Sequence, residues 1–253
     1  MTRRICVMGN SHTAALKGGW EESGGRKDLA PDFFGALSDG MASLSFENGQ
    51  LIPQEPAAAE FFGRISGTGR GVVPGDYDLF LLCGMGMFPV SVFNNYKNFA
   101  TPSTRNAEAP YFVSDACLDD LLWEQISSSM MMHCARLVRQ VSEAEIFLAW
   151  QAFYAETLFS IEWRAQQMQP LLDSNDQDYV LERMCKVEDR LRNEGFSVLR
   201  QPGNTITKGI MTKAEFSRGS VLFREELNKP HRENDVFHMN SSYGAQCWQA
   251  WEI

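Results

Sequence analysis

Short runs rich in apolar residues alternate along the chain with longer amphipathic stretches. The runs cover residues 5–8, 30–36, 78–83, 145–150 and 196–200, and each predicts a β-strand. Continuous apolar stretches such as residues 5–8 are typical of strands that helices cover on both faces of a parallel sheet. We therefore expect an α/β fold, a three-layer α/β/α sandwich around a mainly parallel five-stranded sheet of the flavodoxin-like kind.

Amphipathic stretches between these runs repeat their apolar residues every three or four positions, as helices packed on a sheet do. Residues 114–141 show this spacing throughout and predict one long helix, with Ser114 as its N-cap. Residues 176–193 predict another helix. Further helices are expected at residues 13–20, at residues 153–168 and in a terminal segment that Ser241 or Ser242 caps.

Two segments show neither helical nor strand periodicity. Residues 85–113 follow the third predicted strand, and residues 202–234 follow the fifth. Long segments of this kind in compact domains often shape or cover a binding site. We expect two loop insertions here, although the second fits a plain excursion with a short helix equally well. The whole chain, residues 1–253, is expected to fold as a single domain.

Two glycine-containing turns add detail to this picture. Asn48-Gly49, between the apolar parts of residues 42–52, predicts a β-hairpin whose turn needs positive φ angles. Residues 67–71 read Gly-Thr-Gly-Arg-Gly, a composition that also occurs in phosphate-binding loops. Such loops follow a strand and open a helix, whereas this segment precedes the next strand, so a flexible turn is the favoured interpretation.

A small polar turn, Gly9-Asn10-Ser11-His12, follows the first predicted strand directly. A serine at such a turn has its hydroxyl at the carboxyl edge of the sheet, near helix N-terminal N–H groups that can hold an anion. Near the other end of the chain, Asp235 stands three residues before His238. Because a serine nucleophile needs a base, and the base needs a group to orient it, Ser11, His238 and Asp235 are the candidate catalytic residues.

Together these two motifs resemble those of the SGNH (GDSL-like) hydrolase superfamily, over nearly the whole chain. The resemblance implies that Ser11 is the nucleophile and that the backbone N–H groups of Ser11 and Gly84 form the oxyanion hole. The family's third motif is usually Gly-x-Asn-Asp, but this chain has Gly84-Met85-Gly86-Met87 there. Either the oxyanion hole has fewer donors, or another side chain replaces the missing asparagine. The candidates are Asn94, Asn95 and Gln151.

The predicted topology brings several of these groups to one edge of the sheet. The carboxyl ends of parallel strands meet at one edge, which is where open α/β sheets bind ligands. Asn10 is expected to shape the turn beside this edge, and His12 either contacts substrate or points to solvent. The groups expected at the edge are Ser11, Gly84, Gln151 and His238.

The composition of the chain indicates which partners and which cellular compartment to expect. The chain has 23 basic and 32 acidic residues, a net charge of −9, and no dense basic stripe of the kind that binds nucleic acid. The cysteines at positions 6, 83, 117, 134, 185 and 247 form no Cys-x-x-Cys pair and are expected to be reduced. No apolar run approaches membrane-spanning length, and the first strand leaves no room for a signal peptide. We expect a cytoplasmic protein without nucleic-acid or membrane partners, and the sequence leaves its oligomeric state open.

The resemblance implies an esterase, lipase, thioesterase or carbohydrate O-acetylesterase. We expect a serine hydrolase that cleaves acyl esters, with a short-chain or O-acetyl ester of a sugar or other small polar molecule as substrate. This mechanism needs no cofactor and no metal, and the histidines at positions 12, 133, 231 and 238 show no zinc-binding spacing. An acyltransferase of the same fold stays open as an alternative. So does a catalytically weak or inactive binding or assembly protein.

Overall fold

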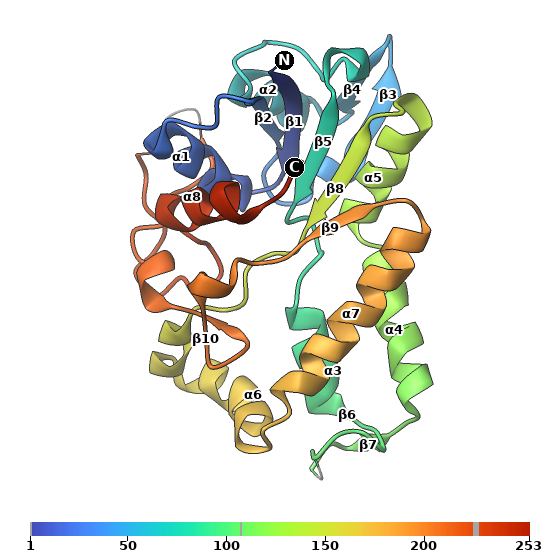
Figure 1. Ribbon diagram of the computed structural model, residues 1–253, viewed down its shortest axis with the longest axis vertical. Helices are drawn as coiled ribbons and strands as arrows, with labels where there is room; N and C mark the ends of the chain where they lie inside the picture. Colours follow the sequence, from blue (N-terminus) through green and yellow to red (C-terminus); the bar gives the residue numbers. More distant parts are fainter. Residues whose placement is uncertain (1, 107, 225–227) are drawn as a thin grey trace.

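A parallel five-stranded sheet lies at the centre of the computed structural model, which describes residues 2–106, 108–224 and 228–253 (Figure 1). Its strand order is β2-β1-β5-β8-β9, and every neighbouring pair is parallel. This order confirms the predicted α/β fold. The strands are β1 (Arg3–Gly9), β2 (Leu29–Gly35), β5 (Leu79–Cys83), β8 (Glu145–Ala149) and β9 (Ser197–Leu199).

The strands end together at one edge of the sheet. Gly9, the last residue of β1, lies opposite Gly35 of β2 and Cys83 of β5. Cys83 lies opposite Ala149 of β8, which in turn lies opposite Leu199 of β9. The segments that follow all five strands therefore leave from the same carboxyl edge, as expected for an open parallel sheet.

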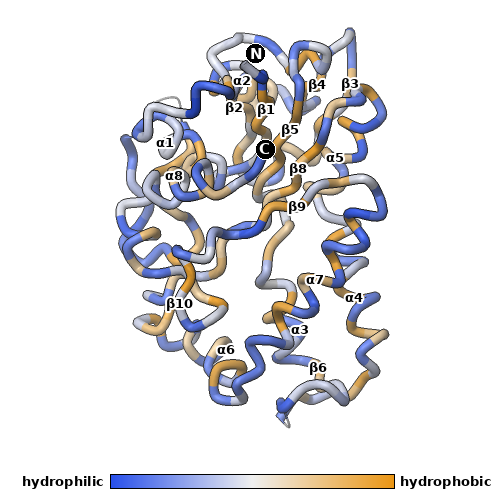
Figure 2. The backbone as a smooth tube through the Cα atoms, viewed as in Figure 1, coloured by the Kyte–Doolittle hydropathy of each residue, from blue (hydrophilic) through white to orange (hydrophobic). Residues whose placement is uncertain are grey.

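Apolar residues of the strands form the centre of the core. Figure 2 colours much of β1, β5 and β8 orange, the colour of hydrophobic residues. Removing this surface from water is the main favourable contribution to folding. All five residues of β5 and the last five of β1 are buried, which accounts for the unbroken apolar runs in the sequence.

Helices cover both faces of the sheet. α1 (Thr13–Ser23) and α8 (Ser241–Ala250) lie together on one side, and α5 (Met130–Val141) lies on the other (Figure 1). α2 (Pro56–Ile65) packs against β2, and α7 (Gln177–Asn193) packs against β9. Within the described residues, no helix is both long enough and apolar enough to cross a membrane.

The single helix predicted over residues 114–141 is wrong, because two helices occupy this range. α4 (Asp115–Ser127) ends before Ser129, and α5 begins after it. The Ser129 hydroxyl accepts a hydrogen bond from the Met132 N–H at 3.4 Å and so caps a new helix. Ser114 caps α4 in the same way, as predicted. Serine hydroxyls that bond the backbone of residue 124 end α4, although the apolar spacing continues across the break.

The prediction that residues 85–113 form a loop without secondary structure is also wrong. This segment contains α3 (Val90–Asn98) and two short strands, β6 (Phe99–Ala100) and β7 (Tyr111–Phe112). α3 packs against α6 (Glu162–Asp173), and both lie beyond the carboxyl edge of the sheet (Figure 1). The described part of residues 202–234 holds only short turns and the strands β10 (Ile206–Thr207) and β11 (Met211–Thr212).

Smaller differences concern helix ends and turns. The helix predicted at residues 153–168 is a 3-10 turn, Glu156–Ser160, followed by α6. Asn240, rather than Ser241 or Ser242, caps α8 through the Tyr243 N–H. The predicted hairpin is confirmed as β3 (Leu44–Glu47) and β4 (Gln50–Pro53), and residues 67–71 form a turn that opens no helix.

The backbones of α1 and α8 approach each other closely. A Cβ atom added at Gly244 would lie 1.8 Å from the Ala15 carbonyl oxygen, and one added at Gly19 would lie 2.2 Å from the Ala245 nitrogen. The Trp248 indole donates a hydrogen bond to the Leu16 carbonyl at 2.8 Å and joins the same two helices. The spacing of these helices therefore depends on glycine at both crossing positions.

We expect Gly244→Ala to destabilise the protein by about 3 kcal/mol or more, because the new methyl group meets backbone that cannot move aside. Chemical unfolding of the variant and the wild type measures this difference. Gly75→Ala is the matched control, since Gly75 is exposed and an added Cβ meets no atom within 4 Å. Equal losses in the two variants would contradict a backbone contact at Gly244.

Candidate active site

The turn after β1 places Ser11 at the carboxyl edge of the sheet. α1 begins at Thr13, whose N–H bonds the Asn10 carbonyl at 3.0 Å, so strand and helix are joined by only three residues. The Thr13 hydroxyl lies 3.2 Å from the Cys83 sulfur, which fixes the turn against the end of β5. The Ser11 side chain does not cap α1. Its Oγ instead lies 2.8 Å from Nε2 of His238.

Asp235 holds His238 through both of its carboxylate oxygens. Oδ1 accepts the backbone N–H groups of Phe237 and His238, each at 2.8 Å, and Oδ2 accepts Nδ1–H of His238 at 2.9 Å. Because an ionised carboxylate only accepts hydrogen bonds, the neutral His238 ring carries its proton on Nδ1. Nε2 is then free to accept the Ser11 hydroxyl proton. The structure thus brings together the three residues that the sequence singles out.

The loop that carries Asp235 and His238 is anchored on both sides. The buried Val236 accepts a hydrogen bond from the Ala155 N–H at 3.0 Å, which ties the loop to the segment after β8. Asn240 caps α8 and donates its side-chain amide to the carbonyls of Glu215 and Arg218. His238 is therefore held between two fixed points of the backbone.

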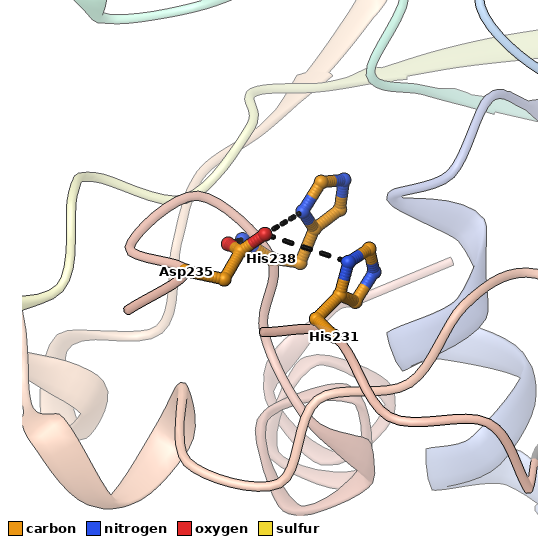
Figure 3. Close-up of side chains that lie close together, drawn as sticks. All are labelled: His231, Asp235 and His238. Carbon is orange, nitrogen blue, oxygen red and sulfur yellow. Dashed lines mark hydrogen bonds and ion pairs between the residues drawn. The ribbon is translucent and has the colours of Figure 1, made fainter. Parts of the chain in front are cut away.

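Two further histidines stack on the His238 ring. His231 lies at a centroid distance of 3.9 Å with an interplanar angle of 11°, and His12 lies at 4.6 Å with an angle of 19°. Both rings are therefore nearly parallel to the His238 imidazole. Figure 3 shows His231 beside His238, with Asp235 joined to both rings. His12 thus packs on the candidate base, which is neither of the two roles that the sequence analysis expected.

The charge states in this cluster follow from burial and from the neighbouring groups. Burial alone would raise the pKa of Asp235, but hydrogen bonds from the ring and the backbone N–H of His238 outweigh it and hold the pKa well below its usual range. Burial, together with the nearby His238 ring, lowers the pKa of His12 to about 3. The same two causes lower the pKa of His231. Asp235 is therefore ionised and both flanking imidazoles are neutral at neutral pH.

Gly84 opens an unusual turn after β5. Gly84, Met85 and Gly86 have φ angles of 76°, 54° and 92°, a left-handed run that a residue with a Cβ rarely adopts. A Cβ atom at Gly84 would also lie 2.2 Å from Oδ1 of Asn10, so only glycine fits. The N–H groups of Gly84 and Ser11 have no acceptor among the described residues. Both are free to bind an oxygen atom at the carboxyl edge.

Of the three side chains considered for the missing asparagine, one lies near Gly84. Gln151 follows β8, is 9% exposed, and lines a small pocket together with Gly84 and His12. Asn95 is buried elsewhere, where its amide donates to Gln125 at 2.9 Å, and Asn94 is exposed on α3. The geometry therefore favours Gln151 as the additional polar group of this edge.

His231, Asp235 and His238 also form a cluster of metal-binding residue types, with ligand atoms within 4.8 Å of one another. Their arrangement does not suit a metal ion. A cation in the plane of one imidazole would lie well out of the plane of the other, because the two rings are stacked, and Nδ1 of His238 carries a proton for Asp235. The cluster fits a hydrogen-bonded acid–histidine pair with a stacked neighbour.

His231 is the residue of this site that the sequence interpretation missed. It stands four residues before Asp235 and seven before His238, within the segment considered a loop insertion. The pattern His-x-x-x-Asp-x-x-His was the available signal. Without zinc spacing, it gave no reason to place the first histidine against the second.

Comparisons with known proteins do not assign this chain to a family. No protein-family model matches it, and no curated protein does. Among solved structures, the chain is similar to a GDSL-like lipase from Bacteroides thetaiotaomicron, with 10% identity, a TM-score of 0.36, and coverage of 92% of this chain and 82% of the lipase. An FMN-dependent cysteine decarboxylase, SpaF, also matches, with 10% identity, a TM-score of 0.25 and coverage of 79% and 84%. These likenesses are too low to carry an argument, so the function must be argued from the site itself.

We expect His12 to make stability depend on pH. Below about pH 6.5 the unfolded chain takes up a proton at this residue, whereas the folded protein, with a pKa of about 3, does not. The free energy of unfolding should therefore fall with falling pH between these two values, by up to about 1.4 kcal/mol per pH unit. His12→Phe keeps a ring on His238 and removes the proton site.

Urea unfolding of the wild type and His12→Phe between pH 7 and pH 4 measures this effect. The variant should lose stability less steeply than the wild type as the pH falls. Parallel curves for the two proteins would show that the imidazole at position 12 is not held neutral in the folded state.

Proposed function

We propose that this protein is a serine hydrolase that cleaves short-chain or O-acetyl esters of a sugar or other small polar molecule. One observation carries the proposal. A continuous series of hydrogen bonds runs from Ser11 Oγ to His238 Nε2 at 2.8 Å and from His238 Nδ1 to Asp235 Oδ2 at 2.9 Å. This is the arrangement in which a histidine removes the proton of a serine nucleophile.

In the proposed reaction Ser11 attacks the ester carbonyl while His238 takes the hydroxyl proton. Asp235 remains ionised, keeps the ring in the required tautomer and stabilises the imidazolium that forms. His238 then gives this proton to the departing alcohol, which leaves an acyl group on Ser11. Water activated by the same histidine releases the acid and restores the free serine. No step requires a cofactor.

Two free backbone N–H groups are suited to the negative charge that develops on the carbonyl oxygen. Those of Ser11 and Gly84 lack an acceptor among the described residues and belong to the turns that follow β1 and β5. Such donors stabilise the transition state because they are in place before charge develops. Gln151 lines the pocket beside Gly84 and is proposed as the third donor, in place of the usual asparagine.

The space beside Gly84 favours a short acyl group. The pocket lined by His12, Gly84 and Gln151 has a volume of about 30 Å³. Since about 10–15 Å³ of such space holds one water molecule, the pocket admits a group of no more than a few heavy atoms. A methyl group fits such a space, whereas a fatty acyl chain would need another path. The volume therefore supports an acetyl or similarly small acyl group.

We expect Ser11→Ala to reduce hydrolysis of para-nitrophenyl acetate by about a thousandfold or more, because the attacking oxygen is removed. Initial rates of the wild type and the variant measure this. Labelling with a fluorophosphonate, followed by mass mapping, should place the adduct on Ser11. Ser128→Ala is the control, since Ser128 is exposed in the turn between α4 and α5 and should keep full activity. If the folded wild type neither labels nor exceeds the Ser11→Ala rate, the hydrolase proposal fails in favour of a binding or assembly role.

We expect Gln151→Leu to lower kcat by about a hundredfold with little change in KM, because an oxyanion donor acts mainly in the transition state. Asn94→Leu is the matched control and should change neither constant. Steady-state kinetics with para-nitrophenyl acetate gives both values. An effect on KM alone would assign Gln151 to substrate binding instead.

A further inference from the structure

A pocket of about 510 Å³ adjoins the candidate active site on the side of Asp235. It lies between the start of α6 and the segment that leads to His238. His231 and Asp235 both line it, and both contact His238, one by stacking at 3.9 Å and the other by a hydrogen bond of 2.9 Å. One imidazole ring and two hydrogen bonds separate Ser11 from this pocket.

Three cationic side chains line the pocket. Arg164, Lys229 and Arg232 all face it, and none forms an ion pair or side-chain hydrogen bond with a described residue. Asp235 is the one carboxylate among the described lining residues, and His238 already engages it. A chain with a net charge of −9 thus leaves three cations together beside its candidate catalytic group. Unpaired charges of one sign in a concave site attract a ligand of the opposite sign.

Aromatic rings hold one of these cations in place. The Arg164 guanidinium lies 4.3 Å from the centroid of Phe237 and 4.7 Å from that of Trp163. Both rings line the pocket. Trp163 is 57% exposed, so a large apolar side chain faces water here. A guanidinium that is already fixed loses little conformational freedom when an anion binds. The pocket therefore combines a preorganised cation with an apolar wall.

We propose that this pocket binds an anionic group of the substrate, a carboxylate or a phosphate, attached by a short apolar or planar spacer to the ester that Ser11 cleaves. This inference rests on the proposed hydrolase function and narrows it to acidic esters. If the acyl group enters the small pocket beside Gly84, the anion belongs to the alcohol part. An anion on the acyl part would instead require that part to turn toward Arg164.

Two pairs of esters test the charge preference and locate the anion. Para-acetoxybenzoate carries the charge on the alcohol part, and methyl para-acetoxybenzoate is its neutral partner. Para-nitrophenyl hydrogen adipate carries the charge on the acyl part, and para-nitrophenyl hexanoate is its neutral partner. We expect one anionic ester to exceed its neutral partner in kcat/KM by about tenfold or more, with a preference that falls as sodium chloride is added.

Variants of the exposed cations keep the fold and remove the charge. Lys229→Gln and Arg232→Gln, singly and together, should raise KM for the preferred anionic ester by about tenfold and leave the neutral esters unchanged. Arg218→Gln changes the net charge equally, but Arg218 lies outside the pocket and is the matched control. An equal effect of Arg218→Gln would overturn the pocket assignment, because it would reflect the overall field of the protein.

Calorimetric titration of Ser11→Ala protein with adipate and with phenyl phosphate separates this inference from the hydrolase proposal. Binding that Lys229→Gln/Arg232→Gln abolishes supports the anion site, even if no ester is hydrolysed, and the stronger ligand distinguishes a carboxylate from a phosphate. If Ser11 cleaves neutral esters but neither anion binds and neither anionic ester is preferred, the anion site is wrong and the hydrolase proposal stands.

Discussion

The close contact between α1 and α8 determines whether the two ends of the sequence can form one site. Ser11 lies two residues before α1, and His238 lies three residues before α8. Helices are stiff over this length, so the position of each side chain follows from where its helix packs. With glycine at both crossing positions, the distance between the helices is set by backbone atoms that cannot adapt. The 2.8 Å contact of Ser11 with His238 depends on this packing.

The sequence predicted the sheet because its strands are buried on both faces and therefore apolar throughout, as in β5. It could not predict the break between α4 and α5, since the apolar spacing is the same on both sides of Ser129. Only the competition between serine hydroxyls and backbone groups ends the first helix there. α3 was missed for a different reason. A nine-residue helix gives too few repeats for its period to emerge.

The sequence could predict which residues lie together where local sequence determines their position, and it could not where loop conformation does. Ser11 and Gly84 are fixed by the strands that they follow, and Asp235 reaches His238 within one turn of backbone. The stacking of His231 and the cluster of cations around Arg164 join α6 to residues far along the chain. Such contacts depend on the path of the segment after β9, which carries no periodic pattern. Periodicity in the sequence therefore predicts the sheet and its helices, but it does not predict the shape of the pocket.

Charge balance around His238 connects the cluster of histidines to the neighbouring pocket. In the proposed reaction this ring becomes a cation, and another unit charge 4 Å away would cost about 4 kcal/mol at an effective dielectric constant of 20. Burial avoids that cost by keeping His12 and His231 neutral. Asp235, which bonds His238 and lines the pocket, stands between this ring and the three cations of the pocket. An anionic substrate group would therefore bind to the cations, while the Asp235 carboxylate stabilises the imidazolium that forms.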